Sequence, residues 1–412
     1  MGQLLKELLT GSTVANAFER GEKLLAAVLA SRWFPERAAY IPQLEAKSDL
    51  IGWQTAIHWH GLAGILKQYH SEALAHLSPA FRDSLNKLHL HDVTQALHQF
   101  TLTKAVLTAM QEAGILAIPI KGTILSVHLY GNIGARNSND IDVLVDPDDF
   151  ERACHLMVEL GYQPRFDLFG DIHTIKHVLA LHKDVSFSRS DEPRIELHFR
   201  NEPDLETSLP RLSEIQGMQS FRYQGLRCLT LGPNELRNSI AQHALRSSVS
   251  RWKWGYDVVQ LVSTTTNTEN PFYESNTHSR AEDICLQVLA QEWNIPMKVT
   301  SHRISARLIV GAGRARRRYC TSTHGHKRFI ALLKLRLLQI PATSAIYEQW
   351  KDRLCQVNTT IKIGWHPSHS NWQAFALTRL PPAGIVIVML RSAQRLIRGL
   401  TQRSHKGTNK PQ

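Results

Sequence analysis

The chain has 412 residues, is 43% hydrophobic and carries a net charge of +12. This hydrophobic content excludes a disordered chain, and the length allows two or three domains, each with its own core. No apolar run approaches the roughly 20 residues that a transmembrane helix needs, and the early Lys6 and Glu7 do not fit a secretory signal. A cytoplasmic protein is therefore expected, and its positive charge favours anionic partners such as nucleotides, nucleic acid or anionic lipid.

Cysteine usage agrees with a reducing compartment. The five cysteines lie far apart and form no CxxC pair: Cys154, Cys228, Cys285, Cys320 and Cys355. Such spacing argues against a disulfide framework and against a zinc site. We expect these cysteines to be reduced thiols.

Three regions and a tail follow from the hydrophobic pattern. Apolar residues recur at helical spacing as far as about residue 110, and again after Pro233, a residue that suits a helix start. Between them, short apolar runs alternate with turn residues, which is typical of α/β structure. The predicted regions are a helical N-terminal region (1–110), an α/β core (111–232), a helical C-terminal region (233–400) and a disordered basic tail (401–412).

The first half of the predicted core alternates strands with a helix. Gly114 breaks the preceding helix, and the elements that follow are short and bounded by turn residues. Their predicted order is a buried strand (115–120), a Lys-Gly turn (121–122), a helix (123–131), a polar loop (135–139) and a second strand (140–146).

The second half of the predicted core holds a helix and a hairpin. Asp146 suits the N-cap of this helix and Pro147 its first position, and Gly161 suits its end. Further on, KDVSFS (183–188) and RIELHF (194–199) flank an Asp-Glu-Pro turn. This pattern predicts two antiparallel strands.

Acidic side chains occupy one face of each of two predicted strands. Because side chains alternate along a strand, Asp140 and Asp142 share a face, as do Glu196 and His198, while the residues between them point to the core. The acids are therefore expected outside the core. If the strands are neighbours, three carboxylates gather, and a divalent cation would relieve their repulsion. Mg²⁺ or Mn²⁺ held by Asp140, Asp142 and Glu196 would support phosphoryl-transfer chemistry.

Each of these residues also has an ordinary structural explanation. A lone DxD sequence is most often a solvated strand edge or a turn, and a histidine such as His198 is more often structural than catalytic. The combination of strand, Lys-Gly turn, helix, polar loop, DxD strand and acid-bearing hairpin favours the functional interpretation.

Several stretches together resemble a known family. They are IPIKGTIL (118–125), LYG (129–131), ARNSNDIDVLV (135–145), ELGY (159–162), IELHFR (195–200) and RWKWGYDV (251–258). As a set they are similar to the bacterial family of uncharacterised nucleotidyltransferases, in the superfamily of polymerase beta-like enzymes. The resemblance implies an α+β fold, in which a mixed-sheet nucleotidyltransferase core lies between N-terminal and C-terminal helical regions. It also implies Mg-dependent transfer of a nucleotidyl group from a nucleoside triphosphate such as ATP to an acceptor hydroxyl or phosphate.

The resemblance assigns the acidic residues to metal binding and catalysis. Asp140 and Asp142 match the metal-binding pair of the family. Glu196 matches the third acidic position, which completes the metal site and acts as the base toward the acceptor hydroxyl. His198, on the same strand face, is a further candidate for lining the site.

The resemblance also assigns the turn before the first helix to nucleotide binding. Lys121, Gly122 and Thr123 match the position where the superfamily usually has Gly-Ser. A glycine turn that opens a helix offers backbone N–H groups to phosphate, and Lys121 adds a positive charge. Arg136 can reach a phosphate from the loop before Asp140. The sequence departs from the common pattern in having threonine after the glycine and a longer spacing to Asp140.

A tryptophan-rich helical stretch and an upstream histidine offer further candidates. Trp252 or Trp254 would wall the acceptor or base site, and Asp257 would orient a neighbour, with Arg251 or Lys253 nearby. Core aromatics and a surface ion pair are the more common explanation of this pattern. His243 is most often a packed helix histidine, and lining of the site is the alternative.

Two basic segments contain no acidic residue: residues 298–336 and the chain from Arg391 onward. The run RARRRY (314–319) fits a solvated loop as well as a contact with nucleic-acid phosphates. The amphipathic helix that begins near Arg391 suits an anionic membrane surface or, more commonly, peripheral packing.

Two other classes of function stay open. One is a related transferase acting on a modified peptide or sugar. The other is a non-catalytic nucleotide- or nucleic-acid-binding module, against which the three acids argue. An enzyme acting on nucleic-acid ends would need the 298–336 segment to face the site. The expected partners are therefore a nucleoside triphosphate and an acceptor that is a small molecule, a peptide or a nucleic-acid end.

Overall fold

The computed structural model of the protein describes most of the chain up to residue 321. The described residues are 12–165, 168, 175, 178–179, 183–199, 212–215, 217–266, 269–273, 279–297 and 303–321. The predicted tail (401–412), the helix near Arg391 and the basic segment beyond residue 321 lie outside these ranges.

The N-terminal region is helical, as the sequence predicts. Its described elements are α2 (Ser12–Ala30), the 3-10 helix η1 (Pro35–Tyr40), α3 (Ile41–Glu45), α4 (Leu50–His60), α5 (Ala63–Tyr69), α6 (Ser71–Ala75) and α7 (Pro79–Glu112). Helix α4 illustrates the local signals. The Asp49 carboxylate accepts a hydrogen bond from the Gly52 backbone N–H at 2.7 Å, and Gly61 ends the helix in a left-handed conformation.

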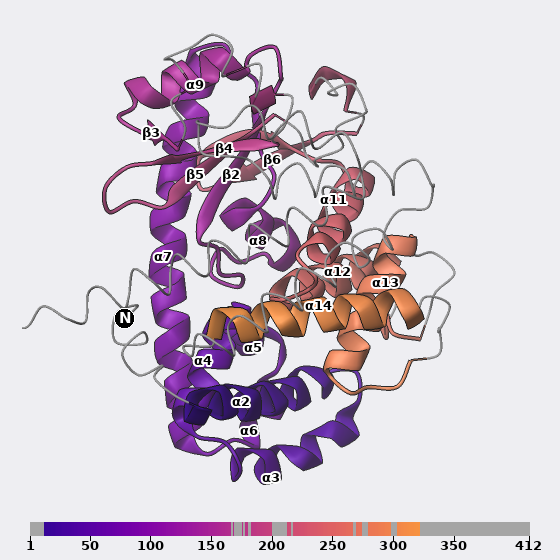
Figure 1. The fold of residues 1–412 in the computed structure, drawn as a ribbon. Helices are drawn as coiled ribbons and strands as arrows, with labels where there is room; N and C mark the ends of the chain where they lie inside the picture. Colours follow the sequence, from indigo (N-terminus) through magenta and orange to yellow (C-terminus); the bar gives the residue numbers. More distant parts are fainter. Residues whose placement is uncertain are drawn as a thin grey trace, which may run out of the picture.

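Helix α7 runs along most of the height of the molecule (Figure 1) and takes part in two hydrophobic cores. Its first half, with Leu85 and Leu88, packs among the N-terminal helices. Its second half, with Phe100 and Leu107, packs against the sheet. The helix ends just before Gly114, which has a φ of 66°, as predicted. Helix α7 therefore fixes the sheet relative to the N-terminal helices.

A mixed five-stranded sheet forms the core. Its strands are β1 (Ala117–Pro119), β2 (Asp140–Val145), β3 (Gln163–Pro164), β4 (Asp184–Ser188) and β5 (Arg194–His198). Their order is β1-β2-β5-β4-β3; β2 and β5 are parallel, and the other neighbours are antiparallel. The predicted hairpin is confirmed as the β4–β5 pair. A separate hairpin, β6 (Gln219–Tyr223) with β7 (Leu226–Thr230), contacts β1.

Both faces of β2 are buried. Two helices flank this strand, α8 (Gly122–Tyr130) and α9 (Phe150–Glu159). The apolar face of β2 packs with α7 and α9 through Ile141, Val143 and Val145. The other face carries the acids, but it does not lie at the solvent, because Asp142 is only 5% exposed. The expectation that the acids lie outside the core is therefore wrong for Asp142, since alternation along a strand does not reveal what covers its second face.

The start of α9 also differs from the expectation. Asp146 is not the N-cap, because the helix begins three residues later than predicted, at Phe150. The Asp146 carboxylate instead accepts hydrogen bonds from the backbone N–H groups of Asp148 (3.0 Å) and Leu212 (2.9 Å). The second bond joins the end of β2 to a distant part of the chain, which no local pattern encodes. The helix ends just before Gly161, as predicted.

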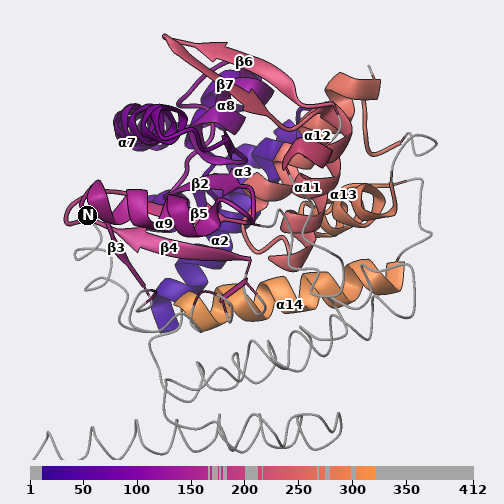
Figure 2. The ribbon, with the colours of Figure 1, turned by 90° about the horizontal axis from the view of Figure 1, so that it is seen from above.

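The C-terminal region is helical as far as it is described. Its helices are α11 (Pro233–Arg246), α12 (Trp252–Thr266), α13 (Arg280–Glu292) and α14 (Arg303–Thr321). Figure 2 shows α11, α12 and α13 on one side of the sheet, with α14 running below β4 in this view. Trp33 from the N-terminal region stacks on Trp293 with ring centroids 6.1 Å apart and contacts Tyr256, so both helical regions share one core. Within the described ranges, no helix is long and apolar enough to cross a bilayer.

The loop that leads into β2 packs tightly against α5 and α7. Gly64 of α5 lies so close that a Cβ there would be 2.1 Å from the carbonyl oxygen of Gly134 and 2.6 Å from that of Ala135. On the other side, a Cβ on Gly134 would be 2.5 Å from a methyl group of Val93. These glycines allow the chain before Asp140 to sit between two helices.

We expect Gly64→Ala to lower the free energy of unfolding by about 2 kcal/mol, because overpacking against backbone outweighs the better helix propensity of alanine. Chemical denaturation would measure it. Lys67→Ala, at an exposed position of the same helix, should change stability by less than about 0.5 kcal/mol. Equal stability of the Gly64 variant and the parent would contradict the tight packing of this loop.

Candidate active site

The first turn of α8 opens toward the polar face of β2. Gly122 has a φ of 69°, which favours glycine, and a Cβ there would lie 3.6 Å from the Asp140 carbonyl oxygen. The hydroxyl of Thr123 is buried and has no hydrogen-bond partner among the described residues. The turn thus combines backbone N–H groups at a helix N-terminus with an unsatisfied hydroxyl, an arrangement suited to an anion.

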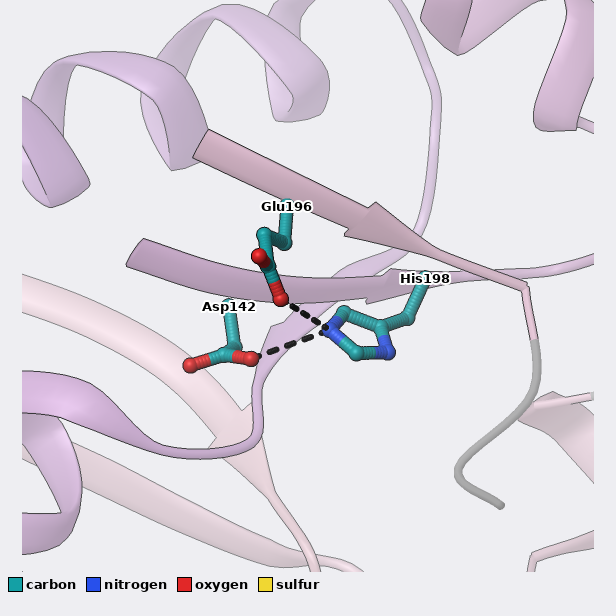
Figure 3. A group of neighbouring side chains, drawn as sticks. All are labelled: Asp142, Glu196 and His198. Atoms are coloured by element: carbon teal, nitrogen blue, oxygen red, sulfur yellow. Dashed lines mark hydrogen bonds and ion pairs between the residues drawn. The ribbon is translucent and has the colours of Figure 1, made fainter. Parts of the chain in front are cut away.

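Two acids and a histidine meet on the polar face of the sheet. Asp142 lies opposite Glu196 in the parallel β2–β5 pair, and His198 is one side-chain step further along β5. Within the described part of the chain, this is the one group of three such residues that could hold a metal, with donor atoms within 4.8 Å of one another. Figure 3 shows the His198 ring pointing toward both carboxylates. The structure therefore brings Asp142 and Glu196 together, with His198 as the third member.

His198 orients Asp142. Its Nε2 lies 3.0 Å from Asp142 Oδ1, whereas Glu196 Oε2 is 3.9 Å away. Burial and the charge of Lys183 lower the pKa of His198, so the ring is neutral at pH 7. A neutral ring that donates from Nε2 has an unprotonated Nδ1, which explains why Nδ1 has no hydrogen-bond partner although Asp184 is 3.8 Å away.

Asp142 stays ionised although it is buried. Burial alone would raise its pKa, but Lys121 and His198 hold the pKa well below its usual range. The Lys121 ammonium lies 3.6 Å from Asp142 Oδ1 and is itself buried. The site therefore holds a buried carboxylate in its anionic form, which is the form that binds metal.

Glu196 has the opposite tendency. Burial, followed by the negative charges of Asp142 and Asp140, raises the pKa of Glu196 to about 7. Such crowding of like charges disfavours ionisation of the last carboxylate. A divalent cation at this position would remove the penalty, so the donor set fits a metal ion.

Asp140 lies at the edge of this group. It is partly exposed and is 3.8 Å from Arg194, which also approaches Glu196 at 3.5 Å. On the far side of His198, Lys183 forms a close ion pair with Asp184. Sequence patterns did not single out this pair, because the β4–β5 register alone brings Asp184 opposite His198.

Arg136 and Asp257 form a buried ion pair. Arg136 is 3% exposed, and its Nε donates to Asp257 Oδ2 at 2.7 Å. The Tyr130 hydroxyl donates to the other oxygen of Asp257, also at 2.7 Å. The expectation of a surface ion pair, with Arg251 or Lys253 as the neighbour of Asp257, is therefore wrong; the partner comes from the loop before β2, about 120 residues away.

Side chains from α7 and α12 hold the loop before Asp140. Lys253 Nζ donates to the Asn137 carbonyl oxygen at 2.7 Å, and the Asn137 side chain donates to Asp92 at 2.7 Å. Gln99 donates to the Ser138 carbonyl oxygen at 2.9 Å. Burial and the charge of Arg136 lower the pKa of Lys253 to about 7. This buried lysine, which the sequence offered only as a neighbour of Asp257, fixes the entry to β2.

His243 and Trp254 lie beside the site. Burial and the charge of Lys121 lower the pKa of His243 well below its usual value, and Asp142 is among the charges that act on it. Trp254 is half-buried and stands perpendicular to His243, with ring centroids 5.1 Å apart. Trp252, in contrast, is buried in the core and stacks on His60. Of the candidates from α11 and α12, His243 and Trp254 are therefore the ones that we expect to line the site.

The basic run at 314–319 lies in helix α14. The expectation that it forms a solvated loop is therefore wrong. Arg317 is buried and pairs with Glu292 at 2.7 Å and with Glu22 at 3.0 Å. Arg314 pairs with Glu292 at 3.1 Å. Part of this charge therefore joins α14 to α13 and α2.

The sheet, the glycine turn at the start of α8 and the acids on β2 and β5 define a nucleotidyltransferase-type core. The family of uncharacterised nucleotidyltransferases matches residues 52–290, which is more than half of the chain. The chain belongs to this family, and the expected α+β fold with helical flanks is confirmed. No curated protein and no solved structure shows significant similarity to the chain.

The raised pKa of Glu196 predicts an unusual pH dependence. The folded state binds its proton more tightly than the unfolded state, so stability should fall as pH rises from about 4.5 to about 7. At about 1.4 kcal/mol per pKa unit, the loss is at most about 3.5 kcal/mol. In EDTA, Glu196→Gln should therefore be more stable than the parent above pH 7, as urea denaturation across this pH range would show.

The control is Glu112→Gln, at an exposed position, which should leave the dependence of stability on pH unchanged. A Glu196→Gln variant that is less stable than the parent at pH 8 would contradict this account.

Proposed function

We propose that the protein is a divalent-metal-dependent nucleotidyltransferase, which moves a nucleotidyl group from a nucleoside triphosphate to an acceptor hydroxyl or phosphate. One observation carries the proposal: the in-register pair of Asp142 and Glu196 lies on the same sheet face as the glycine-opened N-terminus of α8. An anionic metal site beside a phosphate-binding turn is what this chemistry needs.

Asp142 and Glu196 would hold the metal, with Asp140 completing the set from the same face of β2. Mg²⁺ or Mn²⁺ fits these oxygen donors, and when bound it neutralises the phosphates and lowers the pKa of an attacking hydroxyl. His198 would act behind Asp142, because its Nε2–H donates to that carboxylate and fixes its orientation.

The triphosphate would bind at the start of α8. Gly122 would permit close approach of the phosphate to the backbone. The Thr123 hydroxyl, which has no hydrogen-bond partner among the described residues, would donate to a phosphate oxygen. Lys121 would add a positive charge at the same turn, and Arg136 would add a second one from the loop before β2, partly offset by its ion pair with Asp257. Trp254 would form a wall for the base or the acceptor.

Glu196 would be the base. A carboxylate that holds the metal through one oxygen could accept the proton of an acceptor hydroxyl with the other, because the metal would lower the pKa of that hydroxyl. A non-catalytic binding module would have no use for this costly crowding of acids, which favours an enzyme. A related transferase with a peptide or sugar acceptor would use the same metal and phosphate groups, so the nature of the acceptor is a separate question.

We expect Thr123→Val to weaken triphosphate binding about tenfold without destabilising the fold, because valine has the same shape and removes an unsatisfied hydroxyl. Thr103→Val is the matched control, since that buried hydroxyl donates to the Gln99 carbonyl oxygen at 2.8 Å. The control should lose stability and keep its affinity for triphosphate. Calorimetry and thermal unfolding of both variants would test this; unchanged affinity in Thr123→Val would remove the hydroxyl from the phosphate site.

Triphosphate binding should depend on Mg²⁺ or Mn²⁺ and should be lost in EDTA. Asp142→Asn should abolish metal-dependent binding and transfer, detected by mass spectrometry of candidate acceptors. It should also destabilise the fold by about 3 kcal/mol, because Lys121 would lose its buried partner. Asp83→Asn, at an exposed position of α7, should do neither. Equal triphosphate affinity in EDTA and in Mg²⁺ would reject a role for metal.

A further inference from the structure

The carboxylates of the site make unusually long ion pairs. Lys121 lies 3.6 Å from Asp142, and Arg194 lies 3.8 Å from Asp140 and 3.5 Å from Glu196. Charge-assisted hydrogen bonds normally measure about 2.7–2.9 Å. The cations beside these three acids are therefore close enough to neutralise charge but do not form tight bonds.

Buried ion pairs elsewhere in the protein are tight. Arg136 and Asp257, Arg237 and Glu282, and Arg317 and Glu292 each approach to 2.7 Å. Compared with these buried pairs, the contact between the buried side chains of Lys121 and Asp142 is unusually long. A cation at such a distance can leave the carboxylate for another partner, because little hydrogen-bond energy is lost when it moves away.

Lys121 is placed to exchange between two partners. It is buried, it is the residue before the first turn of α8, and its ammonium faces Asp142 Oδ1, the oxygen that also accepts from His198. The same turn carries the Thr123 hydroxyl, which is buried and has no hydrogen-bond partner among the described residues. A short movement would therefore carry the ammonium from the carboxylate to a phosphate bound at this turn.

We propose that Lys121 couples the two ligands of the site: it competes with the divalent cation for Asp142, and a bound triphosphate draws it away. This inference rests on the proposed function. Competition follows because a cation at Asp142 is repelled by the ammonium beside it. Coupling follows because an anion that binds Lys121 removes that repulsion, and such linkage is reciprocal.

The competition predicts effects of opposite sign in a single variant. Lys121→Met should bind Mn²⁺ alone at least about tenfold more tightly than the parent, measured by calorimetry without nucleotide. With Mn²⁺ in excess, the same variant should bind inorganic triphosphate about tenfold more weakly, because the ammonium no longer meets the phosphates.

Two control variants separate this role from simpler ones. Thr123→Val should weaken triphosphate binding but leave the affinity for Mn²⁺ alone unchanged. Arg194→Gln should change Mn²⁺ affinity by less than about threefold, because Arg194 is half exposed and solvent screens its charge. Only Lys121 is expected to move the two affinities in opposite directions.

Loss of a buried partner can destabilise a fold, so Lys121→Gln and thermal unfolding with and without Mn²⁺ form the second measurement. Mn²⁺ should raise the melting temperature of either Lys121 variant more than that of the parent. Unchanged or weaker Mn²⁺ binding in the variants, or a failure of both to fold even with Mn²⁺, would overturn the coupling. Absence of metal-dependent triphosphate binding in the parent would instead reject the proposed function.

Discussion

The parallel pairing of β2 with β5 is the constraint on which the site depends. Its register sets Asp142 opposite Glu196, and both side chains then share a buried face of the sheet. Two acids in such surroundings are unfavourable unless cations compensate them. Lys121 and Lys183 provide that compensation, and so the chemistry of the site begins with the charge balance of one strand pair.

The surrounding helices make this strand pair possible. Three helices hold the loop before Asp140 in place: α5 packs against it at Gly64, and α7 and α12 donate hydrogen bonds to it from Gln99 and Lys253. The loop in turn places Arg136 against Asp257, which joins the C-terminal helices to the core. The helical flanks therefore do more than cover the sheet: they determine where β2 begins.

Much of this arrangement was predictable from local sequence. Alternation of side chains identified β2 and β5 and the face that carries Asp142, Glu196 and His198, and Gly114 and Gly161 marked helix ends. The misread features depend on distant residues. The Asp146 carboxylate accepts from Asp148 and Leu212 and does not cap α9, and Asp257 pairs with Arg136 across the fold. Contacts between residues so far apart in the chain produce no local sequence pattern from which they could be predicted.

Helix α7 has a thermodynamic consequence for the whole molecule. Its two halves belong to different hydrophobic cores, with Leu85 in one and Phe100 in the other. If either core unfolds, one half of this helix loses its packing partners while the other half remains packed. We therefore expect the sheet and the helical flanks to unfold as one cooperative unit, so that amide exchange in α7 follows global opening rather than local fraying.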